Sequence, residues 1–191
     1  MSSRTPTRWI AATALALAAG TASAHTGDHA VVGFASGFAH PFLGLDHLLA
    51  MLAIGLWAAQ QGGRALWAVP AAFLAAMGVG GALVWLGGAL PLVETGIALS
   101  VLVLGLLIAT RRQWAAPAGM AVAAGFALFH GYAHGLEMPQ AASPLLYALG
   151  FVLATAALHA AGIAGNLLGR RAVQWAGAAI AATGLALIVA A

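Results

Sequence analysis

Residues 40–51 have the sequence His-Pro-Phe-Leu-Gly-Leu-Asp-His-Leu-Leu-Ala-Met, which places two histidines and an aspartate inside an otherwise apolar stretch. Ionisable side chains are costly in the hydrocarbon layer of a membrane, so they usually face a cavity, pair with one another or bind an ion. Pro41 removes a backbone hydrogen bond and Gly44 loosens the chain further, so we expect the segment to bend or break there. Broken helices at membrane depth typically line binding sites.

Three residues of this stretch are candidate metal ligands. His40 and His47 are seven residues apart and would share one face of a continuous helix. Asp46 is expected either to bind the metal directly or to hold the His47 ring in its correct tautomer. Met51 offers a soft thioether, although a packing role in the core accounts for it as well.

A second polar cluster lies near the end of a later apolar segment, where residues 129–137 have the sequence Phe-His-Gly-Tyr-Ala-His-Gly-Leu-Glu. On a helix, His130 and His134 lie one turn apart, and Glu137 follows one turn later if the helix continues past Gly135. Imidazole suits zinc, copper, iron and nickel. Two clusters of this kind indicate a path or site for a transition metal. Hydrogen-bonded structural groups are the alternative.

The composition is that of a helical protein with several membrane-spanning segments. Hydrophobic residues make up 63% of the chain and charged residues only 6%, whereas a soluble domain carries about a quarter charged residues. Several apolar runs reach the roughly 20 residues that span a bilayer as helix. The absence of cysteine excludes disulfides, thiolate metal sites and cysteine nucleophiles. No basic run exceeds two residues, so a nucleic-acid partner is not expected.

Residues 1–24 are predicted to be a cleavable signal peptide. Arg4 and Arg8 precede a short apolar core, and Ala-Ser-Ala at 22–24 fits the small-residue cleavage rule. An uncleaved first membrane helix is the alternative. Residues 25–191 are predicted to form a single all-α domain of six transmembrane helices, the first kinked at Pro41. We expect these helices at 31–59, 65–88, 92–110, 115–136, 144–168 and 172–190.

The charged residues predict an orientation. If residue 25 lies outside the membrane, all seven arginines fall on the inner side, as the positive-inside rule requires, and both mature termini lie outside. The four acidic residues and six of the seven histidines then map to the outer half. His159 is the exception, deeper in the fifth helix. It is expected to be either a hydrogen-bonded packing residue or a ligand that passes a metal on.

Cleavage after residue 24 would create a polar N-terminal tail. His25 would then carry an imidazole and a free amine, and Asp28 and His29 follow closely. One hypothesis is that this tail captures a metal outside and hands it inward. The alternative is a solvated tail with no metal-binding role.

The pattern His-Pro-x-x-Gly-x-Asp-His-x-x-x-Met at 40–51 resembles the HupE/UreJ family, as do the stretch at 129–137 and a signal peptide ending before a histidine. Members of that family are regarded as secondary nickel permeases, some handling cobalt, encoded alongside hydrogenase or urease systems. The resemblance implies that the residues critical for transport are His40, Asp46, His47, His130, His134 and Glu137.

The resemblance implies import of Ni²⁺ or Co²⁺ through a multi-pass protein of the bacterial inner membrane, with both mature termini periplasmic. The metal would be the transported substrate, with no permanently bound cofactor and no enzymatic activity. No nucleotide-binding motif is present, which favours facilitated or ion-coupled transport. The expected partners are the lipid bilayer and a divalent ion. A second copy of the chain in a homo-oligomer and cytoplasmic nickel chaperones are further possible partners. The alternative functions are an intramembrane zinc hydrolase and a b-type haem protein.

Overall fold

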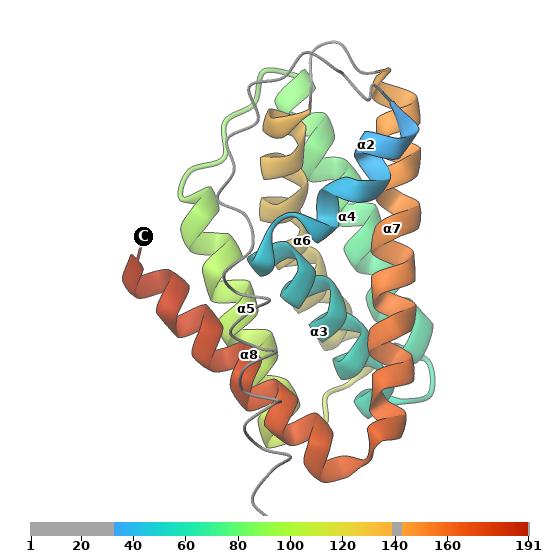
Figure 1. Ribbon diagram of the computed structural model, residues 1–191, viewed down its shortest axis with the longest axis vertical. Helices are drawn as coiled ribbons and strands as arrows, with labels where there is room; N and C mark the ends of the chain where they lie inside the picture. The colour runs from blue at the N-terminus through green and yellow to red at the C-terminus, as the bar shows by residue number, and fades with distance from the viewer. Residues whose placement is uncertain (1–32, 139–142, 191) are drawn as a thin grey trace, which may run out of the picture. The chain divides into compact units, whose positions relative to one another are not determined.

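The computed structural model describes residues 33–138 and 143–190, which are helical apart from their loops (Figure 1). The predicted signal peptide and the tail residues His25, Asp28 and His29 lie outside this part. The elements in chain order are α2 (Phe34–Ala39), η1 (His40–Phe42), α3 (Leu45–Gln61), α4 (Ala65–Trp85), α5 (Val93–Thr110), α6 (Ala116–Glu137), α7 (Pro144–Gly165), η2 (Asn166–Leu168) and α8 (Arg170–Ala190).

Four helices are long and apolar enough to cross a membrane: α4, α5, α7 together with η2, and α8. A fifth crossing is present if the bent pair formed by 34–42 and α3 counts as one span. Helix α6 has 22 residues, enough for a crossing, but its two histidines and one glutamate lower its hydrophobicity. The crossing by α6 therefore stays a prediction.

The first predicted segment is broken where the sequence indicates. Pro41 lies in the short helix η1, and Gly44 takes an extended conformation (φ −99°, ψ 123°) as the residue that starts α3. The two sides of the break differ in direction by 83°. The expectation that His40 and His47 share one face of a continuous helix is therefore wrong, because His40 belongs to η1 and His47 to α3.

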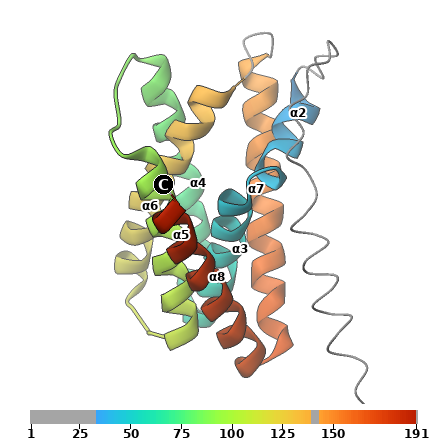
Figure 2. The ribbon, with the colours of Figure 1, turned by 60° about the vertical axis from the view of Figure 1, so that its left-hand side comes forward.

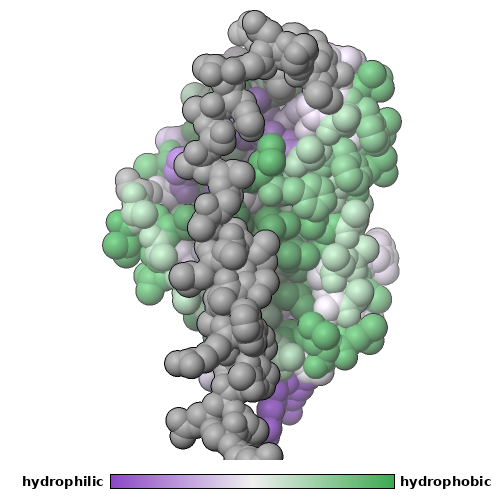
Figure 3. All heavy atoms as spheres, in the orientation of Figure 1, coloured by the Kyte–Doolittle hydropathy of each residue, from purple (hydrophilic) through white to green (hydrophobic). Residues whose placement is uncertain are grey.

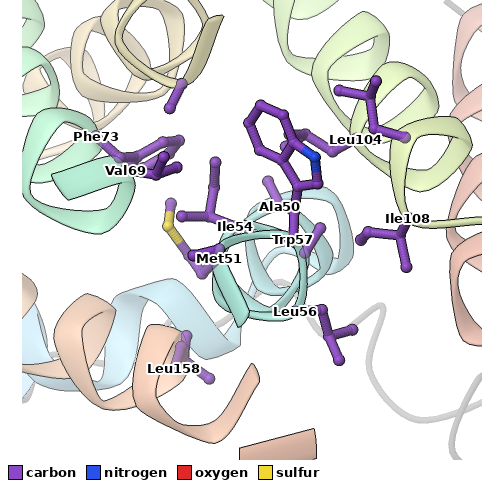
Figure 4. Close-up of a cluster of buried hydrophobic side chains, with 14 of the residues drawn as sticks. Ala50, Met51, Ile54, Leu56, Trp57, Val69, Phe73, Leu104, Ile108 and Leu158 are labelled. Carbon is purple, nitrogen blue, oxygen red and sulfur yellow. The ribbon is translucent and has the colours of Figure 1, made fainter. Parts of the chain in front are cut away.

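Helix α3 is the centre of the bundle. It contacts α4, α5 and α7, and ten of its 17 residues are buried. Met51, Ile54 and Trp57 have no exposed surface, and Figure 4 shows their side chains pointing from α3 toward the surrounding helices. Lipid tails are as apolar as these side chains, so close packing rather than the hydrophobic effect holds the helices together.

Small residues allow α3 and α7 to touch through their backbones. A Cβ atom at Gly55 of α3 would collide with the carbonyl oxygen of His159, and one at Gly162 of α7 would collide with the carbonyl oxygen of Leu52. Glycine at these two positions lets the helix axes approach closely. The contact also fixes the level of His159 in the bundle, opposite Gly55.

Three loops meet at one end of the bundle, at the bottom of Figure 1. Gln61 donates to the carbonyl of Arg112 at 2.8 Å, which joins the α3–α4 and α5–α6 loops. Gln174 of α8 donates to the carbonyl of Ala109 at 3.1 Å, which joins the start of α8 to the end of α5. We call this the arginine end, because its loops and helix starts carry Arg64, Arg111, Arg112, Arg170 and Arg171.

The outer surface fits a membrane environment. Large apolar side chains are exposed along several helices, among them Trp67, Val79 and Trp175. The visible flank in Figure 3 is mostly hydrophobic, and hydrophilic residues are seen at the lower end and beside the grey trace in the upper half. Figure 2 shows α8 lying along α5, its main contact.

We predict that Gly162→Ala destabilises the fold while Gly78→Ala does not. The added methyl group at position 162 meets backbone atoms that cannot move aside, whereas nothing lies within 4 Å of a Cβ at Gly78. Overpacking of this kind costs about 1–3 kcal/mol, and alanine is the better helix former at an open position. Thermal melting of the purified protein in detergent is the measurement. Equal melting temperatures for the two variants would contradict the close α3–α7 contact.

Candidate metal-binding site

The break between α2 and α3 carries His40 to the ends of α6 and α7. The Nε2 atom of His40 lies 2.9 Å from Oε2 of Glu137, the last residue of α6. The same carboxylate oxygen lies 3.6 Å from Nδ1 of His134. Helix α6 therefore continues past Gly135, and Glu137 faces the same way as His134, as the sequence predicts.

His40, His134 and Glu137 form a candidate three-ligand metal site. One ligand atom from each residue lies within 4.8 Å of the other two. Two imidazoles and a carboxylate are nitrogen and oxygen donors of the kind that divalent zinc, nickel and copper accept. Half of the Glu137 side chain is exposed, whereas His134 is buried. An ion arriving from the surface would therefore meet Glu137 first.

Asp46 holds the ring of His47. Its Oδ1 atom accepts hydrogen bonds from the backbone N–H of His47 at 2.7 Å and from Nδ1 of the same residue at 2.8 Å. The proton of the ring therefore sits on Nδ1, and the lone pair of Nε2 is available for an ion. That nitrogen is buried and has no hydrogen-bond partner in the described residues. These contacts fit the orienting role predicted for Asp46, and direct binding of a metal by its carboxylate stays a prediction.

Gly44 leaves room for this pair. A Cβ atom at position 44 would lie 2.9 Å from Oδ1 of Asp46 and 3.2 Å from Nδ1 of His47. The carboxylate would have to turn away from the ring to relieve the contact. The glycine that breaks the first segment therefore also protects the Asp46–His47 hydrogen bond.

Ser100 of α5 plays the corresponding role for His130. Its Oγ donates to the carbonyl of Ile97 at 2.6 Å and lies 2.8 Å from Nε2 of His130. Because the hydroxyl proton is already donated, Nε2 of His130 must be the donor to Ser100. The lone pair of His130 then lies on Nδ1, which is buried and unpartnered within the described part of the chain.

Four imidazole rings form a continuous row from the surface into the bundle. Ring centroids are 4.9 Å apart for His40 and His134, 4.2 Å for His134 and His47, and 4.8 Å for His47 and His130. We call these four residues the histidine row. His40 keeps 22% of its side chain exposed, whereas His130 has no exposed surface. The row therefore leads from an accessible site to a fully buried one.

A pocket of about 300 Å³ gives access to the start of the row. Its lining residues are His40, Leu43, Gly44, Asp46, His47, Glu94, His134 and Glu137.

Comparison with known proteins places the chain in a family. The model of the family described as HupE / UreJ protein matches residues 13–187. Protein HupE of Rhizobium leguminosarum bv. viciae is 46% identical over 173 residues, which cover 88% of this chain and 90% of that protein. The chain belongs to the HupE/UreJ family. No solved structure matches it significantly.

The resemblance of the two sequence motifs to the HupE/UreJ family is thus confirmed. The structure brings all six residues that the resemblance implies into one cluster. Two other predicted residues lie elsewhere. Met51 is fully buried in the apolar core, consistent with a packing role. His159 is buried outside the cluster, and neither of its ring nitrogens has a hydrogen-bond partner in the described residues. Its two predicted roles, packing and passing a metal on, both stay predictions.

Sequence analysis missed two residues of this HupE/UreJ site. Glu94 lies in the first turn of α5 and lines the pocket, although its position beside a segment start indicates only an interfacial acid. Ser100 lies six residues later and orients His130. A signal was present, since Glu94 is the one acidic residue of the described helices outside the two motifs, and Ser100 is a polar residue in an apolar helix. Neither signal tells which helix the side chain faces.

We predict that Ser100→Ala weakens metal binding although Ser100 is not a ligand. Without the hydroxyl, Nε2 of His130 loses the acceptor that fixes its tautomer, and loss of such a partner typically costs about 10–100-fold in affinity. Co²⁺ titration of the purified protein, followed by visible absorption, measures the effect. Ser36→Ala is the matched control, because among the described residues Ser36 bonds only to the carbonyl of Gly33. Equal affinity in both variants would contradict the orienting role.

Proposed function

We propose that this protein is a permease that imports Ni²⁺, with Co²⁺ as a second substrate, across the inner membrane of a bacterium. The observation that carries the proposal is the histidine row, which begins at an accessible pocket and ends at the fully buried His130. Conduction requires sites that are favourable enough to enter and weak enough to leave, and neighbouring sites let an ion move in steps. Membership of the HupE/UreJ family supports the same function.

The distribution of charge supports an inward direction. The described arginines gather at one end of the bundle, whereas Asp46, Glu94 and Glu137 line the pocket toward the other. Under the positive-inside rule the arginine end faces the cytoplasm and the pocket faces the periplasm. In this proposal the chain crosses the membrane six times after a cleaved signal peptide, with both mature termini in the periplasm.

Each group of the site has a role in this proposal. Glu137 and Glu94 attract the hydrated cation, and Glu137 joins His40 and His134 in replacing part of its hydration shell. His47 and His130 then offer the two nitrogens that Asp46 and Ser100 leave free. No single step demands complete dehydration, because the next imidazole lies within 5 Å of the last.

We expect the triple variant His40→Ala/Asp46→Ala/His47→Ala to lose nickel uptake. The variant removes the imidazoles of His40 and His47 from the histidine row, together with the Asp46 carboxylate that orients His47. Accumulation of radiolabelled nickel in a nickel-uptake-deficient bacterium is the measurement, and uptake should fall by about tenfold or more. Thr183→Ala on α8 is the control at equal membrane levels, since its hydroxyl bonds only within its own helix. Undiminished uptake in the triple variant would remove the row from the transport path.

A zinc hydrolase is the second candidate function, because two histidines and one glutamate beside a pocket are also the ligand set of some catalytic zinc sites. The two functions differ in how firmly the metal is held. We expect the purified protein to release its metal during passage over a chelating column, with less than one equivalent remaining by elemental analysis. One tightly held zinc ion per chain, lost in Glu137→Gln, would instead favour the hydrolase.

A further inference from the structure

His159 is a buried imidazole that the histidine row does not include. It lies on α7 with 2% of its surface exposed, and neither Nδ1 nor Nε2 has a hydrogen-bond partner in the described residues. Buried polar groups nearly always have a partner, because leaving one unsatisfied costs free energy. A histidine that served only packing would be expected to bond at least one nitrogen to a neighbouring backbone or side chain.

A second unpartnered polar group lies beside it. Thr155 precedes His159 by one helical turn and therefore faces the same side of α7. Its side chain is fully buried, and its Oγ1 also has no hydrogen-bond partner in the part of the chain that the structure describes. One helix face thus offers two donor atoms with a free lone pair, one nitrogen of the neutral His159 ring and the Thr155 hydroxyl oxygen.

Phe73 of α4 connects His159 to the histidine row. Its ring centroid lies 5.8 Å from that of His130 and 5.3 Å from that of His159, so the row of rings continues through Phe73. Phe73 is fully buried, and Figure 4 shows it in the same apolar cluster as Met51 and Leu158. A benzene ring is not a metal ligand, but its face attracts a cation. Phe73 therefore separates the two histidines without repelling an ion that passes between them.

The depth of His159 places it between the row and the arginine end. At 1.5 Å of rise per residue, about 22 Å of α7 separates His159 from Pro144 at the start of the helix. The contact of its carbonyl with Gly55 sets it about 12 Å further along α3 than His47. An ion that leaves the buried end of the row toward the arginine end reaches this level next.

We propose that His159, with Thr155, is a second and deeper binding site for a divalent transition-metal ion, reached from His130 past the Phe73 ring. The proposal rests on the proposed function for the direction of passage. Binding at His159 itself can be tested without any transport.

The binding test uses the absence of cysteine from the chain. We expect His159→Cys to show a thiolate-to-cobalt charge-transfer band when the purified full-length protein is titrated with Co²⁺, because the introduced sulfur would be the one thiolate present. Leu158→Cys is the matched control, since Leu158 is buried at the same depth in the apolar cluster, and it should show no such band. Cobalt binding to the His159→Cys protein without the band, or an equal band in both variants, would overturn the deeper site.

The transport test uses His159→Leu in proteoliposomes that enclose a metal-sensitive dye. We expect Ni²⁺ entry to fall by about tenfold or more, while Co²⁺ affinity at the histidine row and the melting temperature stay at wild-type values. Wild-type entry rates in His159→Leu would overturn the place of His159 on the path. If the wild-type protein transports neither ion while the His159→Cys variant shows the charge-transfer band and Leu158→Cys does not, the permease is refuted and the deeper site stands.

Discussion

Polar side chains inside an apolar bundle have little water to satisfy them, so those of the candidate site depend on one another for hydrogen bonds and for orientation. The break in the first span makes this arrangement possible. It turns His40 out of the helical direction and onto Glu137, while α3 carries His47 beside His134. The 83° change of direction thus lets residues on both sides of the break face the same residue of α6, His134. Ser100 and Asp46 complete the set, each bonded to one nitrogen of a ring and leaving the other open.

Much of the fold follows from local signals in the sequence. Gly62 ends α3 with a positive φ, and proline lies in the first turn of both α6 and α7. These residues mark the predicted ends within a few positions, because helix caps depend on the backbone preferences of single residues. The break at Pro41 and Gly44 is local in the same sense, and it was predictable. Its angle was not, since packing against α7 sets the direction of α2.

The candidate site was likewise predictable from the sequence only in part. The six motif residues were predictable, because charged and imidazole side chains are rare in apolar segments and stand out. Their neighbours were not. Ser100 is unremarkable in the sequence and matters only because α5 turns it toward α6, and Glu94 matters only because the start of α5 borders the pocket. The prediction that His40 and His47 share one helix face was wrong because helical periodicity does not continue across a break.

The hydrogen bonds of two buried imidazole rings determine whether an ion that binds them must displace a proton. His47 donates its ring proton to Asp46 and His130 donates its own to Ser100, so a cation can occupy the remaining nitrogen of each ring without displacing a proton. Passage along these two rings would then leave the number of bound protons unchanged. In the proposed permease, these two rings would therefore release no proton in exchange for the two charges of the ion. In the proposed orientation, an inside-negative membrane potential would favour inward movement of a divalent ion by about 2.3 kcal/mol per charge per 100 mV.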